Sequence, residues 1–180
     1  MTPSRLLIES IAGEYRRYKK LAEDAMGQVS DQDLSVPAPG GGNSIAVIVA
    51  HMAGNLKSRF TGFLTTDGEK PWRKRDEEFQ PHQMTRAELL RKWDDGWRVL
   101  LEELDRLEDA DLGREVTIRQ QPLAVRDALM RSLAHAAYHS GQIVLLAKTL
   151  KGDGWRSLSI PLGQSERYNL APSVEKPPAR

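Results

Sequence analysis

The sequence predicts an all-α fold, a four-helix bundle with long crossover loops. Apolar residues recur every three or four positions along four stretches of about 20 residues or more, which is the pattern of amphipathic helices. Segments rich in proline, glycine or mixed charge separate these stretches. Helices with one apolar face each bury those faces together by packing as a bundle. The length of 180 residues fits a single domain, which we expect over residues 1–165, followed by a C-terminal tail over 166–180.

The first two predicted helices differ in how much of their surface is apolar. The first covers residues 4–29, with apolar positions at Leu7, Ile11, Tyr15, Tyr18, Ala22 and Ala25. The segment "SVPAPGGG" ends it, and Asn43 is in position to cap a second helix over residues 44–64. That helix begins with "IAVIVAHMA", which is apolar on nearly every side and predicts deep burial. Its β-branched run also fits a strand, but the later apolar residues keep helical spacing and favour a helix.

The second half of the chain predicts two more helices after a linker over residues 65–84. Thr85 and Glu88 form a capping box in front of a helix that reaches Leu107, in which Trp93 and Trp97 belong to the core. Residues 114–125 have an extended pattern, which fits either a short hairpin or a crossover. The last long helix covers 125–150 and ends before Gly152. The remaining thirty residues are expected to wrap the surface or fray.

Composition excludes several classes of function. The 26 Lys and Arg residues nearly balance the 25 Asp and Glu residues, so no overall field attracts nucleic acid or an anionic membrane. There is no cysteine, which excludes disulfides, thiolate ligands and a cysteine nucleophile and suits a reducing compartment. No stretch approaches the roughly 18 apolar residues of a membrane span, and the N-terminal segment is too polar for a signal peptide. We therefore expect a cytoplasmic protein without a nucleic-acid or membrane partner.

Three of the four histidines fall inside predicted helices. His135 and His139 in "HAAYHSGQI" are four residues apart, so both rings point the same way at the border of the buried face. His51 lies in the most buried helix, where an unsatisfied polar group costs on the order of 1–3 kcal/mol. A divalent ion would satisfy all three rings. A buried histidine by itself is more often bonded to a carbonyl or carboxylate, but the clustering favours a three-histidine metal site.

Other polar side chains surround this candidate site. Asn55, Ser58 and Gln142 lie near the histidines on their helices, although none of them takes a proton at neutral pH. A general base would have to come from the linker or from the first helix, which offers Glu9, Glu14 and Asp24. The fourth histidine, His82, stands in the linker and is expected to be solvated.

The sequence of the linker supports two interpretations of its role. The segment "KPWRKRDEEF" interleaves Trp72 and Phe79 with both signs of charge. It is either a lid in which Arg73 or Arg75 meets an anionic substrate group, or a surface loop fixed by Trp72 in a groove. The second is favoured because aromatic residues in long loops usually anchor them. The acidic residues 76–78 offset the basic run and argue against nucleic-acid binding.

A histidine in the second helix, followed by an HxxxH pattern and "GQI" in the last helix, resembles the DinB superfamily of bacterial metalloproteins, which includes the YfiT-like hydrolases. The segments "GGNSIAVIVAHMAGNLKSRF", "TTDGEKPWRKRDEEF" and "SIPLGQSERYN" resemble an uncharacterised branch of it. The resemblance implies a DinB-like four-helix bundle, a nickel or zinc ion at His51, His135 and His139, and a homodimer. In one departure, Ser140 stands where relatives often have Arg.

The resemblance also implies chemistry, because characterised relatives are metal-dependent transferases that use low-molecular-weight thiols. Three neutral histidines leave a divalent ion two or three open positions, where it acts as a Lewis acid on a small-molecule substrate. Two hypotheses follow. The chain is either a metal-dependent transferase or hydrolase of small molecules, or a non-catalytic bundle that binds metal or serves as a dimeric interaction module. The sequence does not separate them.

Overall fold

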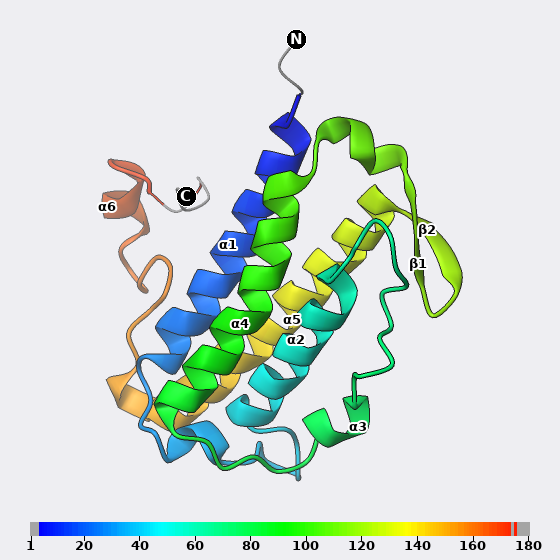
Figure 1. The fold of residues 1–180 in the computed structure, drawn as a ribbon. Coiled ribbons are helices and arrows are strands. Elements are labelled where there is room, and N and C mark those ends of the chain that lie inside the picture. Colours follow the sequence, from blue (N-terminus) through cyan, green and yellow to red (C-terminus); the bar gives the residue numbers. More distant parts are fainter. Residues whose placement is uncertain (1–3, 174, 176–180) are drawn as a thin grey trace.

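The computed structural model describes residues 4–173 and 175, and these are mostly helical with one small sheet (Figure 1). The long helices are α1 (Leu6–Met26), α2 (Ile45–Phe60), α4 (Arg86–Arg106) and α5 (Val125–Lys151). The short ones are α3 (Arg75–Glu78) and α6 (Ser165–Asn169), with 3-10 turns at Asp33–Ser35, Asp109–Gly113 and Gly152–Gly154. Strands β1 (Glu115–Ile118) and β2 (Gln121–Ala124) form an antiparallel pair.

The four long helices lie side by side around one core (Figure 1). Helix α1 packs mainly on α5 and α2 mainly on α4, while α2 also contacts α5. Trp93 and Trp97 of α4 are fully buried, as predicted from the sequence. Helices α2 and α4 approach so closely that a Cβ added at Gly96 would lie 2.7 Å from the Cα of Ala53. Any side chain at position 96 would therefore separate these helices.

Helix α1 covers Leu6–Met26 instead of the predicted residues 4–29, and both predicted ends of the second helix also need correction. Ser44, not Asn43, caps α2: its Oγ accepts a hydrogen bond from the backbone N–H of Val47 at 3.3 Å. Helix α2 ends at Phe60 instead of residue 64, because the chain becomes extended at residue 61 and Gly62 takes a left-handed φ of 60°. Phe63 is nevertheless buried and packs on Phe60, with ring centroids 5.0 Å apart. Helical spacing predicted its burial correctly although it lies in a turn.

One long-range contact and two local features fix other helix ends. The carboxylate of Asp109 accepts hydrogen bonds from the backbone N–H groups of Leu7 and Ile8, which caps α1 from the far end of α4. The capping box of Thr85 and Glu88 is present at the start of α4, as predicted. At the predicted stop of α5, Gly152 has a left-handed φ of 57°. The Asp109 contact therefore ties the start of α1 to the segment that follows α4.

Residues 114–125 form a hairpin, which resolves the choice between hairpin and crossover. Its tip, Arg119 and Gln120, has left-handed φ values of 55° and 61°, where glycine or asparagine is usual. Asp67 of the linker accepts hydrogen bonds from both backbone N–H groups, at 2.9 and 2.7 Å, and from that of Glu69. These backbone hydrogen bonds lower the pKa of Asp67 to about 2. A carboxylate far away in sequence therefore holds a strained turn.

The chain after α5 runs along the surface and its side chains are mostly exposed, as expected. The predicted tail over 166–180 includes α6, while residue 174 and residues 176–180 lie outside the described residues. Within the described ranges, we find no helix that combines the length and the apolar character needed to cross a membrane.

We predict that Asp67→Ala releases the hairpin tip. Losing hydrogen bonds to a charged acceptor should lower the free energy of unfolding by about 1–2 kcal/mol. Urea unfolding checks the stability, and hydrogen exchange should show faster exchange of the Arg119 and Gln120 amides. Glu166→Ala, in exposed α6, is the matched control and should change neither measurement. Unchanged exchange at residues 119 and 120 would contradict the assigned role of Asp67.

Candidate metal centre

The side chains of His51, His135 and His139 meet between α2 and α5. The Nε2 atom of His135 lies 3.1 Å from the Nε2 of His51 and 3.1 Å from the Nε2 of His139. One nitrogen from each ring can be chosen so that all three lie within 4.8 Å of one another. His51 and His139 are buried, and His135 is half-buried. The three predicted ligands are therefore brought together from two helices, and His51 and His135 are 84 residues apart in the chain.

Two of the three rings have a partner that fixes their orientation. The Nδ1–H of His51 donates to Oε2 of Glu78 at 3.0 Å, and the Nδ1–H of His139 donates to Oε1 of Gln142 at 2.8 Å. Since these rings carry their proton on Nδ1, each presents the lone pair of Nε2 to the centre. Carboxylate and amide partners of this kind orient histidine ligands in metal sites.

His135 is the ring without such a partner. Its Nδ1 is buried and makes no hydrogen bond to any of the described residues. Burial, together with the nearby rings of His139 and His51, lowers the pKa of His135 to about 3. Burial and His51 also lower the pKa of His139, partly offset by its hydrogen bond to Gln142. Both rings are therefore neutral near pH 7, which is the protonation state that a metal ligand requires.

Glu78 of α3 joins His51 to Arg73. The guanidinium of Arg73 donates two hydrogen bonds of 2.8 Å to the Glu78 carboxylate, and its side chain is only 2% exposed. Burial raises the pKa of Glu78, but the hydrogen bonds from Arg73 and His51 outweigh it and the net shift is downward. The carboxylate also requires a glycine on α2, because a Cβ at Gly54 would lie 2.1 Å from its Oε1. The chain of Arg73, Glu78 and His51 thus fixes the linker against α2.

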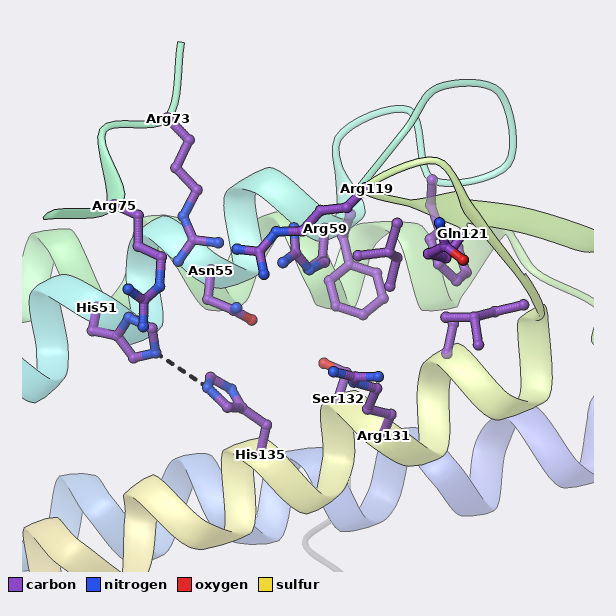
Figure 2. A pocket seen from close by; sticks show the side chains of 15 residues that line it. His51, Asn55, Arg59, Arg73, Arg75, Arg119, Gln121, Arg131, Ser132 and His135 are labelled. Carbon is purple, nitrogen blue, oxygen red and sulfur yellow. Dashed lines mark hydrogen bonds between the residues drawn. The ribbon is translucent and has the colours of Figure 1, made fainter. Parts of the chain in front are cut away.

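A pocket of about 430 Å³ opens beside the histidines (Figure 2). His51 and Asn55 of α2 and His135 of α5 form one end, and the hairpin lies at the other. Apolar side chains of Phe60, Phe63, Ile118, Leu123 and Ala128 line it in part. Five arginines line it as well, namely Arg59, Arg73, Arg75, Arg119 and Arg131, and none of its lining residues is Asp or Glu. The volume and the mixed lining are typical of a small-molecule site.

The other predicted site residues have different places. Asn55 lines the pocket, but Ser58 does not, because its buried Oγ donates to the carbonyl of Gly68 at 2.7 Å. Arg73 lines the pocket while paired with Glu78, and Arg75 lies over the Phe79 ring at 4.8 Å. The expected fixing of the linker by Trp72 is wrong, since that side chain is 53% exposed. The hydrogen bond between His51 of α2 and Glu78, whose carboxylate also pairs with Arg73, fixes the linker instead.

Helix α1 supplies no base to this pocket. Its acidic residues Glu9, Glu14 and Asp24 are absent from the lining, and Glu14 and Asp24 form ion pairs with neighbours on their own helix. Ser140 also faces α1, where its buried Oγ donates to the carbonyl of Tyr18 at 3.1 Å. The position where the resemblance leads one to expect Arg therefore does not face the pocket. His82, expected to be solvated, has a ring nitrogen 3.2 Å from the carbonyl oxygen of Glu78.

Sequence reasoning missed Glu78 and three arginines of the pocket, Arg59, Arg119 and Arg131. In the sequence, Glu78 is one of three acidic residues that offset the basic run of the linker. The available signal was a carboxylate between two aromatic positions in a loop long enough to fold back on the helices. The arginines gave no signal, because they come from α2, the hairpin tip and α5 and meet only in the folded chain.

Comparison with known proteins identifies the family. Residues 3–164 match a sequence-family model described as "Protein of unknown function (DUF1572)". The match covers most of the chain, so the protein belongs to this family. Searches of curated proteins and of solved structures gave no significant match.

We predict that Glu78→Ala lowers the free energy of unfolding by about 3 kcal/mol, because it leaves the buried Arg73 guanidinium without its carboxylate. Arg73→Met should also destabilise, and the double variant should lose clearly less than the sum of the two single losses. Urea unfolding of the four proteins of this cycle measures the coupling. Glu77→Ala, an exposed neighbour, is the control and should change little. Additive losses would show that the pair is not coupled.

Proposed function

We propose that the protein is a DinB-like four-helix bundle that binds one divalent ion, zinc or nickel, through His51, His135 and His139. The observation that carries this proposal is the convergence of three imidazole nitrogens on one point, 3.1 Å apart in two pairs. The four long helices packed around one core support the bundle assignment.

The proton inventory favours a cation at this point. His51 and His139 hold their protons on Nδ1, toward Glu78 and Gln142, so their Nε2 atoms offer only lone pairs. A proton on Nε2 of His135 would satisfy one of these two lone pairs and leave the other unmatched. If that proton lies on Nδ1 instead, three lone pairs face one another. A divalent ion satisfies all three nitrogens at once.

The spacing fits the same conclusion. Zinc–nitrogen bonds of about 2.0–2.1 Å in a tetrahedral site place two ligand nitrogens about 3.3 Å apart. The observed separations of 3.1 Å are close to this value. The Nδ1–H groups of His51 and His139 donate to side-chain oxygens, as the non-ligating N–H of a histidine ligand commonly does.

We further propose that the site is catalytic and that the protein is a metal-dependent transferase acting with a low-molecular-weight thiol. His51 and His135 line a pocket large enough for a small molecule, which supports access of a substrate to the ion. A divalent ion held by three histidines lowers the pKa of a bound thiol or water and so supplies an anionic nucleophile near neutral pH. Asn55 lines the pocket beside the rings and would orient a substrate there.

The alternative is a non-catalytic bundle that binds metal or acts as a dimeric interaction module. One observation favours it: the described residues that line the pocket include no carboxylate to act as a base. Glu78, the carboxylate that contacts His51, is held by Arg73 and has a lowered pKa, so it is a poor proton acceptor. The exposed side chains of Met130, Tyr138 and Leu145 on α5 support the proposal of a homodimer.

Metal binding is tested by titrating the metal-free protein with Zn²⁺, Ni²⁺ and Co²⁺. We expect one ion per chain, with Co²⁺ showing the visible absorption of a nitrogen-bound ion. His51→Ala, His135→Ala and His139→Ala should each weaken binding by about 100-fold or more, because two ligands hold an ion far less tightly than three. His82→Ala is the matched control and should bind as the wild type does. Stoichiometric metal in the His135→Ala/His139→Ala double variant would sink the assignment.

The transferase proposal is tested with glutathione, mycothiol or bacillithiol and an electrophilic chloronitrobenzene. The thiol sulfur bonds to the ring carbon, chloride leaves, and the thiol proton passes to the buffer. We expect the metal-loaded protein to act at least about tenfold faster than the metal-free protein, and His135→Ala to lose this increase. No metal-dependent rate with any of the three thiols would favour the non-catalytic bundle.

A further inference from the structure

The five arginines of the pocket have too few acidic partners. Among the described residues, two carboxylates that are not fully exposed contact them: Glu78 pairs with Arg73, and Glu69 is shared by Arg59 and Arg119. The one other acidic contact, Asp76 beside Arg75, is a 3.8 Å pair to a fully exposed side chain. Five guanidinium groups thus face two such carboxylates, an excess of three positive charges in a partly apolar pocket.

The excess is concentrated away from the histidines. Figure 2 shows Arg59 and Arg119 on one side of the pocket, with Arg131 of α5 on the other side next to Ser132. Arg131 is exposed and makes no hydrogen bond or ion pair with any residue in the described ranges. Arg59 is held in place by the carbonyl of Gly68 and by Glu69, so its position does not depend on a ligand. This end of the pocket therefore presents guanidinium groups from three separate elements.

Backbone strain and charge repulsion accompany the gathering of these arginines. Arg119 occupies a left-handed turn that the Asp67 contacts stabilise, and its side chain donates to Glu69 and lines the pocket. Burial lowers the pKa of Arg59, Glu69 raises it in part, and the charges of Arg73 and Arg119 lower it further. An anion between these groups would relieve their mutual repulsion.

We infer that the pocket binds a small organic oxyanion, either a phosphate or a carboxylate. Its charged group lies between Arg59, Arg119 and Arg131. Guanidinium groups match such oxyanions with paired, charge-assisted hydrogen bonds. The apolar side chains of Phe60, Phe63 and Leu123 lie in the same pocket and suit the carbon part of the ligand. The inference deepens the proposed function, on which it rests, because the uncharged end of the ligand is then directed to His51 and His135, which line the same pocket.

The test uses the metal-free, full-length chain and three probes of similar shape: phenyl phosphate, benzoate and neutral phenol. Calorimetric titration at low salt should show binding of at least one of the two anions and much weaker binding of phenol. Arg131→Gln should weaken anion binding by about tenfold or more, since it removes a charge-assisted contact without breaking any described contact. Arg126→Gln, an exposed arginine on the same helix outside the pocket lining, is the matched control and should stay within about twofold of the wild type.

The outcomes separate the ligand classes and the two proposals. Binding of phenyl phosphate alone assigns the site to phosphates, and binding of benzoate alone assigns it to carboxylates. Phenol binding as tightly as the anions, or equal anion affinity in Arg131→Gln and the wild type, overturns the inference. Metal titration of Arg131→Gln should match the wild type. If the wild-type chain binds metal but neither anion, the oxyanion site alone is wrong. If the wild-type chain binds an anion but no metal, the metal proposal alone is wrong.

Discussion

The buried contact of Glu78 with both Arg73 and His51 is the interaction on which the rest of the site depends. It fixes the linker against α2, because Glu78 of the linker accepts a hydrogen bond from His51 of α2 while it pairs with Arg73, whose side chain is 2% exposed. It also fixes the proton of His51 on Nδ1 and so directs the Nε2 lone pair toward the other two histidines. A charged pair of this kind is seldom worth its desolvation for stability alone. We therefore explain the pair by its effect on His51, whose imidazole it orients.

Most of the fold could be predicted from the sequence because the helical signals are local. The period of apolar residues, the capping box at Thr85 and the glycine after α5 each act within a few residues. The errors fall where a local rule has two solutions. Asn43 and Ser44 are both good caps, and the backbone extended at Ser44 decided between them. The sequence does not decide between a hairpin and a crossover, because four-residue strands are too short to show a clear alternation of apolar and polar residues.

The candidate site divides in the same way. Spacing predicted His135, His139 and Gln142, since residues four or three apart on one helix share a face, and the apolar run around His51 predicted that ring. It could not predict Glu78, because a linker carboxylate among basic residues has the same pattern whether it is solvated or buried against α2. Arg59, Arg119 and Arg131 belong to three elements that approach only when the hairpin packs beside the long helices. Nothing in a nearly neutral composition indicates that five arginines gather in one pocket.

Several local rules are broken around this pocket, and they are broken together. Gly54 interrupts a buried helix, where alanine would favour the helix by about 1 kcal/mol, and the structure uses the space for the Glu78 carboxylate. Arg119 and Gln120 occupy a turn that suits glycine, and Asp67 compensates for it. His135 keeps a buried nitrogen without a partner among the described residues. Each feature lowers stability where it stands, yet each positions a group at the histidines or at the arginines. Selection for stability alone would remove such features independently of one another, so their concentration at one pocket argues that the pocket is what the fold maintains.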